Sequence, residues 1–409
     1  MFPLIHTDAW KPEMPEIRQT AVFSKESGGL KISLPQGKFG IGKWVSEIQT
    51  EGGKSYALTA EAVTEAKVND IYALFTICRA DGSMIIREHI ESVKREGSHV
   101  SFSQVVAVPE EGCGFKLELW LKGYGGEVLW RQPTLTECAP KKERKVRVAM
   151  AYIAPGYANP ITVDSNVAAI TQAVDNAGRE NPDVIVLSEC MYERMTGMSL
   201  KEAAQTAEGT MCTLMRKKAA EYHTYIIYNF HEYDEGEYYN TSILIGRGGE
   251  TVGKYRKNQL TVTEYELGMS PGKGYPVFET DFGKIGILTC FDHYFPQTAE
   301  EIVNNGAEIV FIASAGDAAE KFLARAMDTG VYFAVCGWNM ENRHGWAPAR
   351  VVDPSGKILA QSGQHTVPAV CEIDLNQKIR CHWLSVGPAD TQFKGVYGYE
   401  KNDEGFGLK

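Results

Sequence analysis

The chain has 409 residues, of which 44% are hydrophobic and 23% are charged, a composition typical of soluble globular proteins. This length predicts two domains, or one large domain with an extension. The net charge of −10 argues against nucleic acid or an anionic membrane as the main partner, because either would require a basic surface. No apolar run approaches the roughly 20 residues that cross a bilayer. The first ten residues lack the basic and apolar regions of a signal peptide, so a cytoplasmic location is expected.

Residues 1–140 lack helical periodicity and contain short alternating runs separated by glycine and Asp-Gly pairs. Such runs predict strands joined by turns. The predicted strands are residues 29–34, 55–60, 71–78, 83–90, 99–106 and 115–122. Together they predict an all-β sandwich or jelly roll over residues 1–140.

Aromatic residues in this β segment have two interpretations. They could form a face on which sugars stack, but packing within the sandwich or against the other domain is preferred, because buried aromatic rings dominate such cores. The candidates are Trp44, Tyr56, Trp120, Tyr124 and Trp130. We therefore expect this domain to carry no catalytic group.

A charged linker at residues 141–145 precedes a segment of different character. Apolar strands alternate with helices from residue 146 onward, which predicts an α/β layered fold over residues 146–375. The predicted strands are residues 146–153, 183–187, 225–230, 242–246, 251–256, 285–289, 309–313, 331–336 and the hairpin 349–361. The predicted helices are residues 164–176, 200–222, 298–305 and 318–328. Residues 376–409 have little periodicity and are interpreted as a C-terminal extension.

Nine cysteines are scattered along the chain without a CxxC pair. Their odd number and wide spacing argue against both a disulfide framework and a zinc site. Most are interpreted as small buried hydrophobic residues, as free cysteines generally are. Cys290 is the exception, because of the residues that follow it.

Two reactive side chains follow apolar strands, where α/β folds place their sites. Glu189 comes after residues 184–188, and burial there is expected to raise its pKa to suit a general base. A solvated loop carboxylate or a helix cap would explain it equally well. Lys257 ends a run of cations, and it could stabilise a thiolate and a developing oxyanion. An exposed basic turn is the alternative.

Cys290 gives the sharper pattern. It ends an apolar strand, and a helix is predicted shortly after Pro296. A nucleophile on such a turn lies near backbone N–H groups that can hold an anion. A free thiol has a pKa near 8.5, so a nearby cation and base would be needed to activate it. A buried structural cysteine is the alternative, but the polar and aromatic residues that follow Cys290 argue against it.

These motifs, taken in order, resemble those of the nitrilase superfamily of carbon–nitrogen hydrolases. Glu189 matches the first, Tyr255-Arg256-Lys257 the second, and Cys290-Phe291-Asp292 with Phe295-Pro296 the third. The resemblance covers residues 146–375 and implies an α-β-β-α four-layer sandwich, often paired as a homodimer or higher oligomer. It also implies a catalytic triad of Glu189, Lys257 and Cys290 that needs no metal and no organic cofactor.

Many members of the superfamily have a further glutamate between the lysine and the cysteine. Glu264 is favoured for this place by its spacing ahead of Pro271-Gly272, with Glu266 as the rival. The residues after the nucleophile are candidates for substrate binding: Phe291, His293 and Tyr294.

The predicted activity is hydrolysis of an amide or N-carbamoyl bond in a small molecule through a thioester acyl-enzyme. The Cys290-Phe291-Asp292 sequence is closer to the nucleophile motif of the amidase branches than to that of nitrilases, which resembles Cys-Trp-Glu. The positions after Asp292 lack the arginine that often binds a substrate carboxylate, which disfavours anionic N-carbamoyl amino acids. A thioester acyltransferase and a catalytically idle, glycan-binding scaffold are the alternatives.

Overall fold

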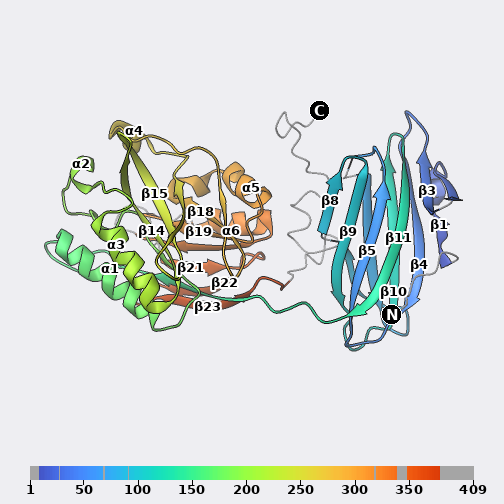
Figure 1. The fold of residues 1–409 in the computed structure, drawn as a ribbon, viewed down its shortest axis with the longest axis horizontal. Coiled ribbons are helices and arrows are strands. Elements are labelled where there is room, and N and C mark those ends of the chain that lie inside the picture. The colour runs from blue at the N-terminus through green and yellow to red at the C-terminus, as the bar shows by residue number, and fades with distance from the viewer. Residues whose placement is uncertain are drawn as a thin grey trace. The chain divides into compact units, whose positions relative to one another are not determined.

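The computed structural model describes residues 9–26, 28–67, 70–90, 92–316, 319–338 and 348–377. The chain forms two compact units that divide between Lys142 and Glu143 (Figure 1). Most of the C-terminal extension expected over residues 376–409 lies outside the described residues. Among the described helices, none is both long and apolar enough to span a bilayer.

The first unit is a sandwich of two antiparallel sheets. One sheet has the strand order β1 (Lys11–Glu13), β4 (Gly40–Gln49), β10 (Gly114–Gly123), β6 (Ile71–Cys78) and β7 (Met84–His89). The other has the order β2 (Val22–Glu26), β3 (Gly29–Leu34), β11 (Gly126–Cys138), β5 (Ser55–Val63), β9 (His99–Ala107) and β8 (Ser92–Glu96). The predicted all-β sandwich is confirmed.

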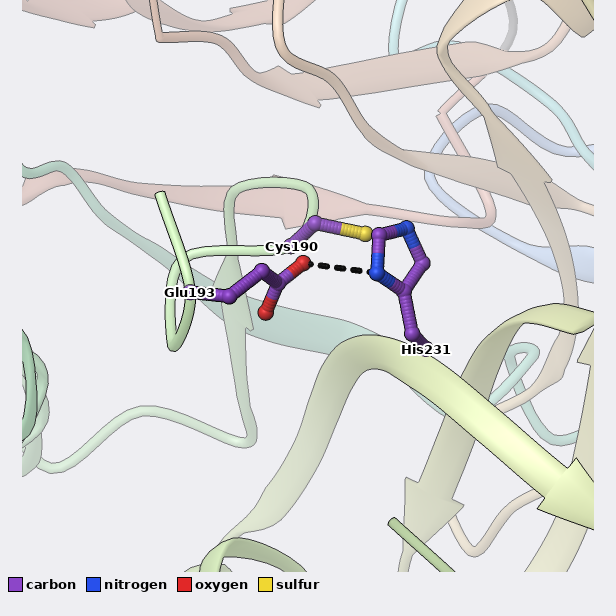
Figure 2. Close-up of side chains that lie close together, drawn as sticks. All are labelled: Cys190, Glu193 and His231. Atoms are coloured by element: carbon purple, nitrogen blue, oxygen red, sulfur yellow. Dashed lines mark ion pairs between the residues drawn. The ribbon is translucent and has the colours of Figure 1, made fainter. Parts of the chain in front are cut away.

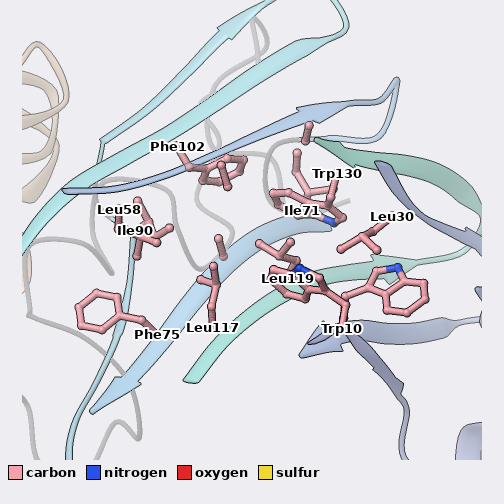
Figure 3. Packing of buried hydrophobic residues seen from close by; sticks show 14 of the residues in the cluster. Trp10, Leu30, Leu58, Ile71, Phe75, Ile90, Phe102, Leu117, Leu119 and Trp130 are labelled. Carbon is pink, nitrogen blue, oxygen red and sulfur yellow. The ribbon is translucent and has the colours of Figure 1, made fainter. Parts of the chain in front are cut away.

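The core of this unit forms from the alternation of side chains along its strands. Leu117 and Leu119 of β10 point into the same cluster as Trp130 of β11, from the opposite sheet (Figure 3). Strands β1, β2, β4, β8 and β11 of this unit were not predicted from the sequence. Glycines open β4, and Pro133 lies at the point where the register of β11 against β5 shifts, and both residue types weaken a strand pattern.

Most of the candidate sugar-stacking rings are packed inside this unit. Three of them are buried in the core: Trp44, Tyr56 and Trp130. Trp120 lies outside the core cluster, but Lys43 Nζ is 4.7 Å from its ring and Tyr72 stacks on it at 5.4 Å. Tyr124 is 71% exposed and makes an edge contact with Phe39.

The second unit contains two six-stranded sheets. One has the order β16 (Thr251–Arg256), β15 (Glu237–Ile245), β14 (Tyr225–Asp234), β13 (Val184–Leu187), β12 (Lys145–Ala151) and β23 (Ala369–Asp374). The other has the order β17 (Val277–Glu279), β18 (Lys284–Thr289), β19 (Ile309–Ala313), β20 (Tyr332–Cys336), β21 (Ala349–Val352) and β22 (Ile358–Ser362). Strands β12, β13 and β14 of the first sheet run parallel, as do β18, β19 and β20 of the second.

Helices cover the outer faces of these sheets and complete four layers. Helices α1 (Val163–Gly178) and α3 (Thr210–Tyr222) pack on the first sheet, and α5 (Pro296–Asn304) and α6 (Ala319–Thr329) pack on the second. The two sheets face each other, with β13 against β19 and β12 against β20. The predicted α-β-β-α sandwich is confirmed (Figure 1).

The single helix predicted over residues 200–222 is wrong. The chain forms a short helix, α2 (Leu200–Ala203), and then leaves helical geometry at Ala204, whose backbone is extended. Gln205 forms a β-bridge with Glu232, and Gly209 caps the start of α3. The apolar pattern continues across this break, so it does not reveal the change in backbone direction.

Candidate active site

The Glu189 carboxylate is buried and fully engaged. One residue, Ser188, separates it from the end of β13, and it is 4% exposed. Its Oε1 accepts hydrogen bonds from Lys257 Nζ at 3.1 Å and from Asn240 Nδ2 at 2.8 Å. Its Oε2 accepts one from the Ala315 N–H at 2.9 Å. Because Ala315 follows β19, this bond joins the two sheets at the site.

The expected upward shift in the pKa of Glu189 is wrong. Burial alone would raise this pKa, but the charges of Lys257 and Arg194 and the hydrogen bond from Asn240 outweigh burial. An interaction with the Cys290 thiol acts in the same direction, and the pKa of Glu189 falls to about 2. The reason is that a buried ammonium stabilises the charged form more than desolvation penalises it. Glu189 is therefore a carboxylate at neutral pH.

Lys257 is a buried cation held between two carboxylates. Its side chain is only 2% exposed, and Nζ lies 2.9 Å from both oxygens of Glu264, besides its bond to Glu189. Burial lowers the pKa of Lys257, but Glu189, Cys290 and Glu264 together raise it above its ordinary value. The side chain is thus an ammonium, and an exposed basic turn does not describe it.

The other two cations of the same run point elsewhere. Lys254 Nζ lies 2.6 Å from one oxygen of buried Glu232, and Arg256 Nε lies 2.9 Å from the other. Side chains alternate between the two faces of a strand, so Lys254 and Arg256 of β16 share one face and pair with Glu232. Lys257, just beyond the end of the strand, points to the opposite side.

Glu264, rather than Glu266, lies against Lys257. Helix α4 (Val262–Glu266) begins with a capping box in which Thr261 and Glu264 bond each other's backbone N–H groups. The Glu264 carboxylate also accepts a hydrogen bond from Asn240 Nδ2 at 2.8 Å. Glu266, on the same short helix, is exposed. The cap thus fixes the direction of Glu264 toward the buried lysine.

Cys290 lies at the turn between β18 and the short helix η4 (Cys290–Tyr294). Its φ of 41° is in the left-handed region, where non-glycine residues are strained and often functional. Burial and the charge of Glu189 raise the pKa of Cys290 to about 11. Lys257, the Ser314 side chain and the Ala315 N–H act in the opposite direction. The resting sulfur is therefore a thiol.

Asp292 connects this turn to the loop after Lys257 through hydrogen bonds. Its Oδ2 accepts hydrogen bonds from the Tyr255 hydroxyl at 2.7 Å and the Thr289 N–H at 2.9 Å. Its Oδ1 accepts one from the Gln259 N–H at 2.9 Å. Burial raises the pKa of Asp292 to about 6 against these hydrogen bonds. The buried carboxyl thereby holds the nucleophile turn and the lysine loop in one arrangement.

The predicted substrate-binding residues occupy different surroundings. Phe291 packs edge-on against Phe295 with ring centroids 5.1 Å apart. His293 is buried, and burial lowers its pKa to about 4. Tyr294 is exposed, with Lys321 Nζ 4.4 Å from its ring centroid. Their contact with a substrate stays a prediction.

The buried asparagines behind the two glutamates were not predicted from the sequence. Asn240 donates to both Glu189 and Glu264. Its own Oδ1 accepts a hydrogen bond from Asn229 Nδ2 at 2.9 Å, and Asn229 also donates to Ser242. A polar residue inside an otherwise apolar strand often has a functional or structural role. Asn229 in β14 and Asn240 in β15 are such residues, and this pattern could have indicated them from the sequence.

Comparison with known proteins identifies the second unit. The family model described as carbon-nitrogen hydrolase matches residues 147–380, more than half of the 409 residues. Omega-amidase NIT2-B of Xenopus laevis is 27% identical over 237 residues, which are 53% of this chain and 85% of that protein. A probable nitrilase of Schizosaccharomyces pombe is 33% identical over 179 residues, or 42% of this chain and 64% of that protein.

A solved structure shares the fold of this unit. The Caenorhabditis elegans NitFhit protein is similar with a TM-score of 0.50 and 20% sequence identity, over 56% of this chain and 61% of that one. This likeness concerns the fold alone. The family match extends over the unit that contains Glu189, Lys257 and Cys290, and the chain belongs to the carbon-nitrogen hydrolase family.

Proposed function

We propose that this protein is an amidase that hydrolyses the carbon–nitrogen bond of a small linear amide through a thioester on Cys290. The observation that carries the proposal is the buried Lys257 ammonium, shared by the Glu189 and Glu264 carboxylates beside a strained cysteine. This combination offers a base, a cation and a nucleophile within one water-poor site, where electrostatic interactions are strong.

Acylation begins with proton transfer from the Cys290 thiol to the Glu189 carboxylate. The sulfur attacks the amide carbon, and the carbonyl oxygen becomes an oxyanion near Lys257 and the Phe291 N–H. As the carbon–nitrogen bond breaks, the protonated Glu189 gives its proton to the nitrogen. Ammonia or an amine leaves, and a thioester remains on Cys290.

Deacylation uses the same carboxylate in the opposite order. Glu189 takes a proton from a water molecule, and the resulting hydroxide attacks the thioester carbon. The carbon–sulfur bond breaks, the carboxylic acid is released, and the proton on Glu189 returns to the Cys290 sulfur. The cycle consumes one water and leaves every group in its initial protonation state.

The charges at the site favour a protonated sulfur in the resting enzyme. Glu189, Glu264 and the Lys257 ammonium together carry a net charge of −1, so a resting thiolate at Cys290 would add a second buried negative charge. The proton therefore stays on sulfur until a substrate carbonyl is present to receive the electrons. Because Glu189 has a low pKa, its protonated form is a strong acid and readily protonates the leaving nitrogen.

The proposed substrate is a neutral amide. The similarity to omega-amidases supports an amide substrate. Because the chain is also similar to a probable nitrilase, the test includes a nitrile as the competing substrate. The net negative charge of the two glutamates and the lysine disfavours an anionic group close to the scissile bond. His293 and Tyr294 stand where an arginine often binds a substrate carboxylate, which disfavours N-carbamoyl amino acids.

The test is release of ammonia from three matched substrates with the same alkyl group: a linear primary amide, an N-carbamoyl amine and a nitrile. We expect the amide to have the largest kcat/KM and the Cys290→Ala variant to release no ammonia from it. A larger kcat/KM for the nitrile or the N-carbamoyl compound would overturn the substrate assignment. Turnover by Cys290→Ala would overturn the mechanism.

A further inference from the structure

We propose that Cys190, Glu193 and His231 form a binding site for a divalent transition-metal ion, with Zn²⁺ as the best-matched ion. The thiol, carboxylate and imidazole each offer one ligand atom, and all three atoms lie within 4.8 Å of one another. Figure 2 shows the three side chains converging from two segments of the chain. The cluster is separate from the groups that carry the proposed amidase chemistry.

The fold brings these residues together for local reasons. Cys190 and Glu193 belong to the turns that follow Glu189, and Cys190 has a left-handed φ of 49°. His231 comes from β14, two residues after Asn229, so both side chains lie on the same face of that strand. The sequence did not indicate this cluster, because His231 is distant in sequence from Cys190 and Glu193 and comes from a separate segment of the chain.

The three donors suit zinc. Zn²⁺ binds thiolate sulfur near 2.3 Å, imidazole nitrogen near 2.0–2.1 Å and carboxylate oxygen near 2.0–2.2 Å, usually in a tetrahedron. Ligand atoms on such a tetrahedron are roughly 3.3–3.6 Å apart. The widest pair of the cluster, within 4.8 Å, therefore needs to close by at most about 1.5 Å, and Glu193 Oε1 and His231 Nδ1, now 3.0 Å apart, need to separate slightly. Three protein ligands would leave the fourth position for water.

The contacts within the cluster also favour an ion. Glu193 Oε1 and His231 Nδ1 lie 3.0 Å apart in side chains that are 10% and 17% exposed. Apart from this contact, which Figure 2 marks as an ion pair, neither atom makes a hydrogen bond with any of the described residues. An ion bound between them would satisfy both atoms, since it needs no shared proton.

Cys190 must lose its proton to become a ligand. Burial, Glu193 and Glu189 raise the pKa of its thiol well above the ordinary value, whereas Arg194 and Lys257 lower it. Metal binding therefore releases one proton from sulfur to solvent. The thiolate and the Glu193 carboxylate then neutralise the two positive charges of the ion, and the imidazole of His231 binds in its neutral form.

The site is linked to the proposed catalytic groups by a chain of hydrogen bonds. The Cys190 thiol donates to Asn229 Oδ1 at 3.2 Å, and Asn229 donates to Asn240 at 2.9 Å. Asn240 in turn donates to Glu189 and Glu264. The Cys190 N–H also donates to Asn229 Oδ1, at 3.0 Å, so this connection remains when the thiol loses its proton.

The binding test uses the full-length Cys290→Ala variant, so that zinc cannot occupy the nucleophile. Chelator-treated protein is titrated with Zn²⁺ by calorimetry and with Co²⁺ by absorbance. We expect one equivalent of zinc to bind with a Kd of about micromolar or tighter and cobalt to give a sulfur-to-metal charge-transfer band. Adding Glu193→Gln or His231→Gln should weaken zinc binding by at least about 100-fold, as expected for loss of a direct ligand.

Two control variants are matched in residue type. Cys371→Ser and His99→Gln alter a cysteine and an exposed histidine outside the cluster and should leave the affinity unchanged. Zinc should raise the Tm of the Cys290→Ala protein but not that of its His231→Gln derivative, since only a ligand bound to the native state stabilises it. Binding weaker than about micromolar, binding that persists with Glu193→Gln and His231→Gln, or binding that needs Cys290 would each overturn the site.

Discussion

Replacement of Glu264 by glutamine separates the role of this residue from a general effect of charge on helix α4. The carboxylate accepts hydrogen bonds from Lys257 Nζ, from Asn240 Nδ2 and from the N–H and hydroxyl of Thr261. A carboxylate accepts at both oxygens, whereas a glutamine amide accepts at one and donates at the other. Whichever way the new amide is turned, its NH₂ group faces a donor.

The size of the effect follows from these contacts. A hydrogen bond to a charged group contributes about 1.5–3 kcal/mol, and removing one partner of a buried ion pair costs about 3–5 kcal/mol. Lys257 keeps Glu189 as a second partner at 3.1 Å, so we expect a stability loss near the lower limit, about 3 kcal/mol. Displacement of Lys257 from its place should lower kcat/KM roughly 100-fold, the usual result of a misplacement of about one ångström.

The same change should also make Cys290 easier to ionise. Removal of one buried negative charge near the Lys257 ammonium lowers the energy of the thiolate, so the pH at which iodoacetamide labels Cys290 should decrease relative to wild type. Glu266→Gln is the matched control, because it makes the same chemical change at an exposed position two residues away. Equal kinetics and labelling profiles for the two variants would refute this account of Glu264.

Three further expectations follow from the described contacts. Glu189→Gln should slow acylation and thioester hydrolysis by about 10²-fold or more each, because both need the same proton carrier; rapid-quench kinetics with a normal rate for either step would contradict this. The pKa of Asp292 is raised to about 6. The native state therefore gains about 3 kcal/mol of stability at pH values below the ordinary pKa of Asp, and this gain is lost as pH rises through 6. If urea titrations between pH 4 and 7 show an unchanging stability difference between wild type and Asp292→Asn, this expectation is wrong. Because Lys43 and Tyr72 cover the Trp120 ring, glycan arrays should detect no binding tighter than about millimolar; a micromolar ligand lost in Trp120→Ala would show that this ring is a binding surface.

The layer architecture was predictable because the strands of both units carry strong patterns. In β10, alternation places Leu117 and Leu119 in the core, and in the second unit short apolar runs alternate with amphipathic helices. Elements without such a pattern were missed. Strand β11 contains Pro133 at a shift of register, and the break between α2 and α3 depends on a bridge from Gln205 to a distant strand.

The position of the site was also predictable, but its electrostatics were not. Glu189 and Cys290 follow apolar strands, and Lys257 follows β16, so their neighbourhood could be expected from strand ends and from the family resemblance. The direction of the Glu189 pKa depends on a cation that approaches from another strand, at 3.1 Å. Asn240 of β15 donates to both carboxylates, and only the tertiary fold brings these groups into contact.

The measurement that tests the central claim most directly is identification of the acyl-enzyme. Wild-type protein is quenched in acid during steady-state turnover of an amide substrate, digested and examined by mass spectrometry. We predict that one peptide gains the mass of the acyl group, that fragmentation assigns this mass to Cys290, and that hydroxylamine removes it as expected for a thioester. An acyl group on Cys190 or Cys336, or amide hydrolysis by Cys290→Ala, would contradict the account.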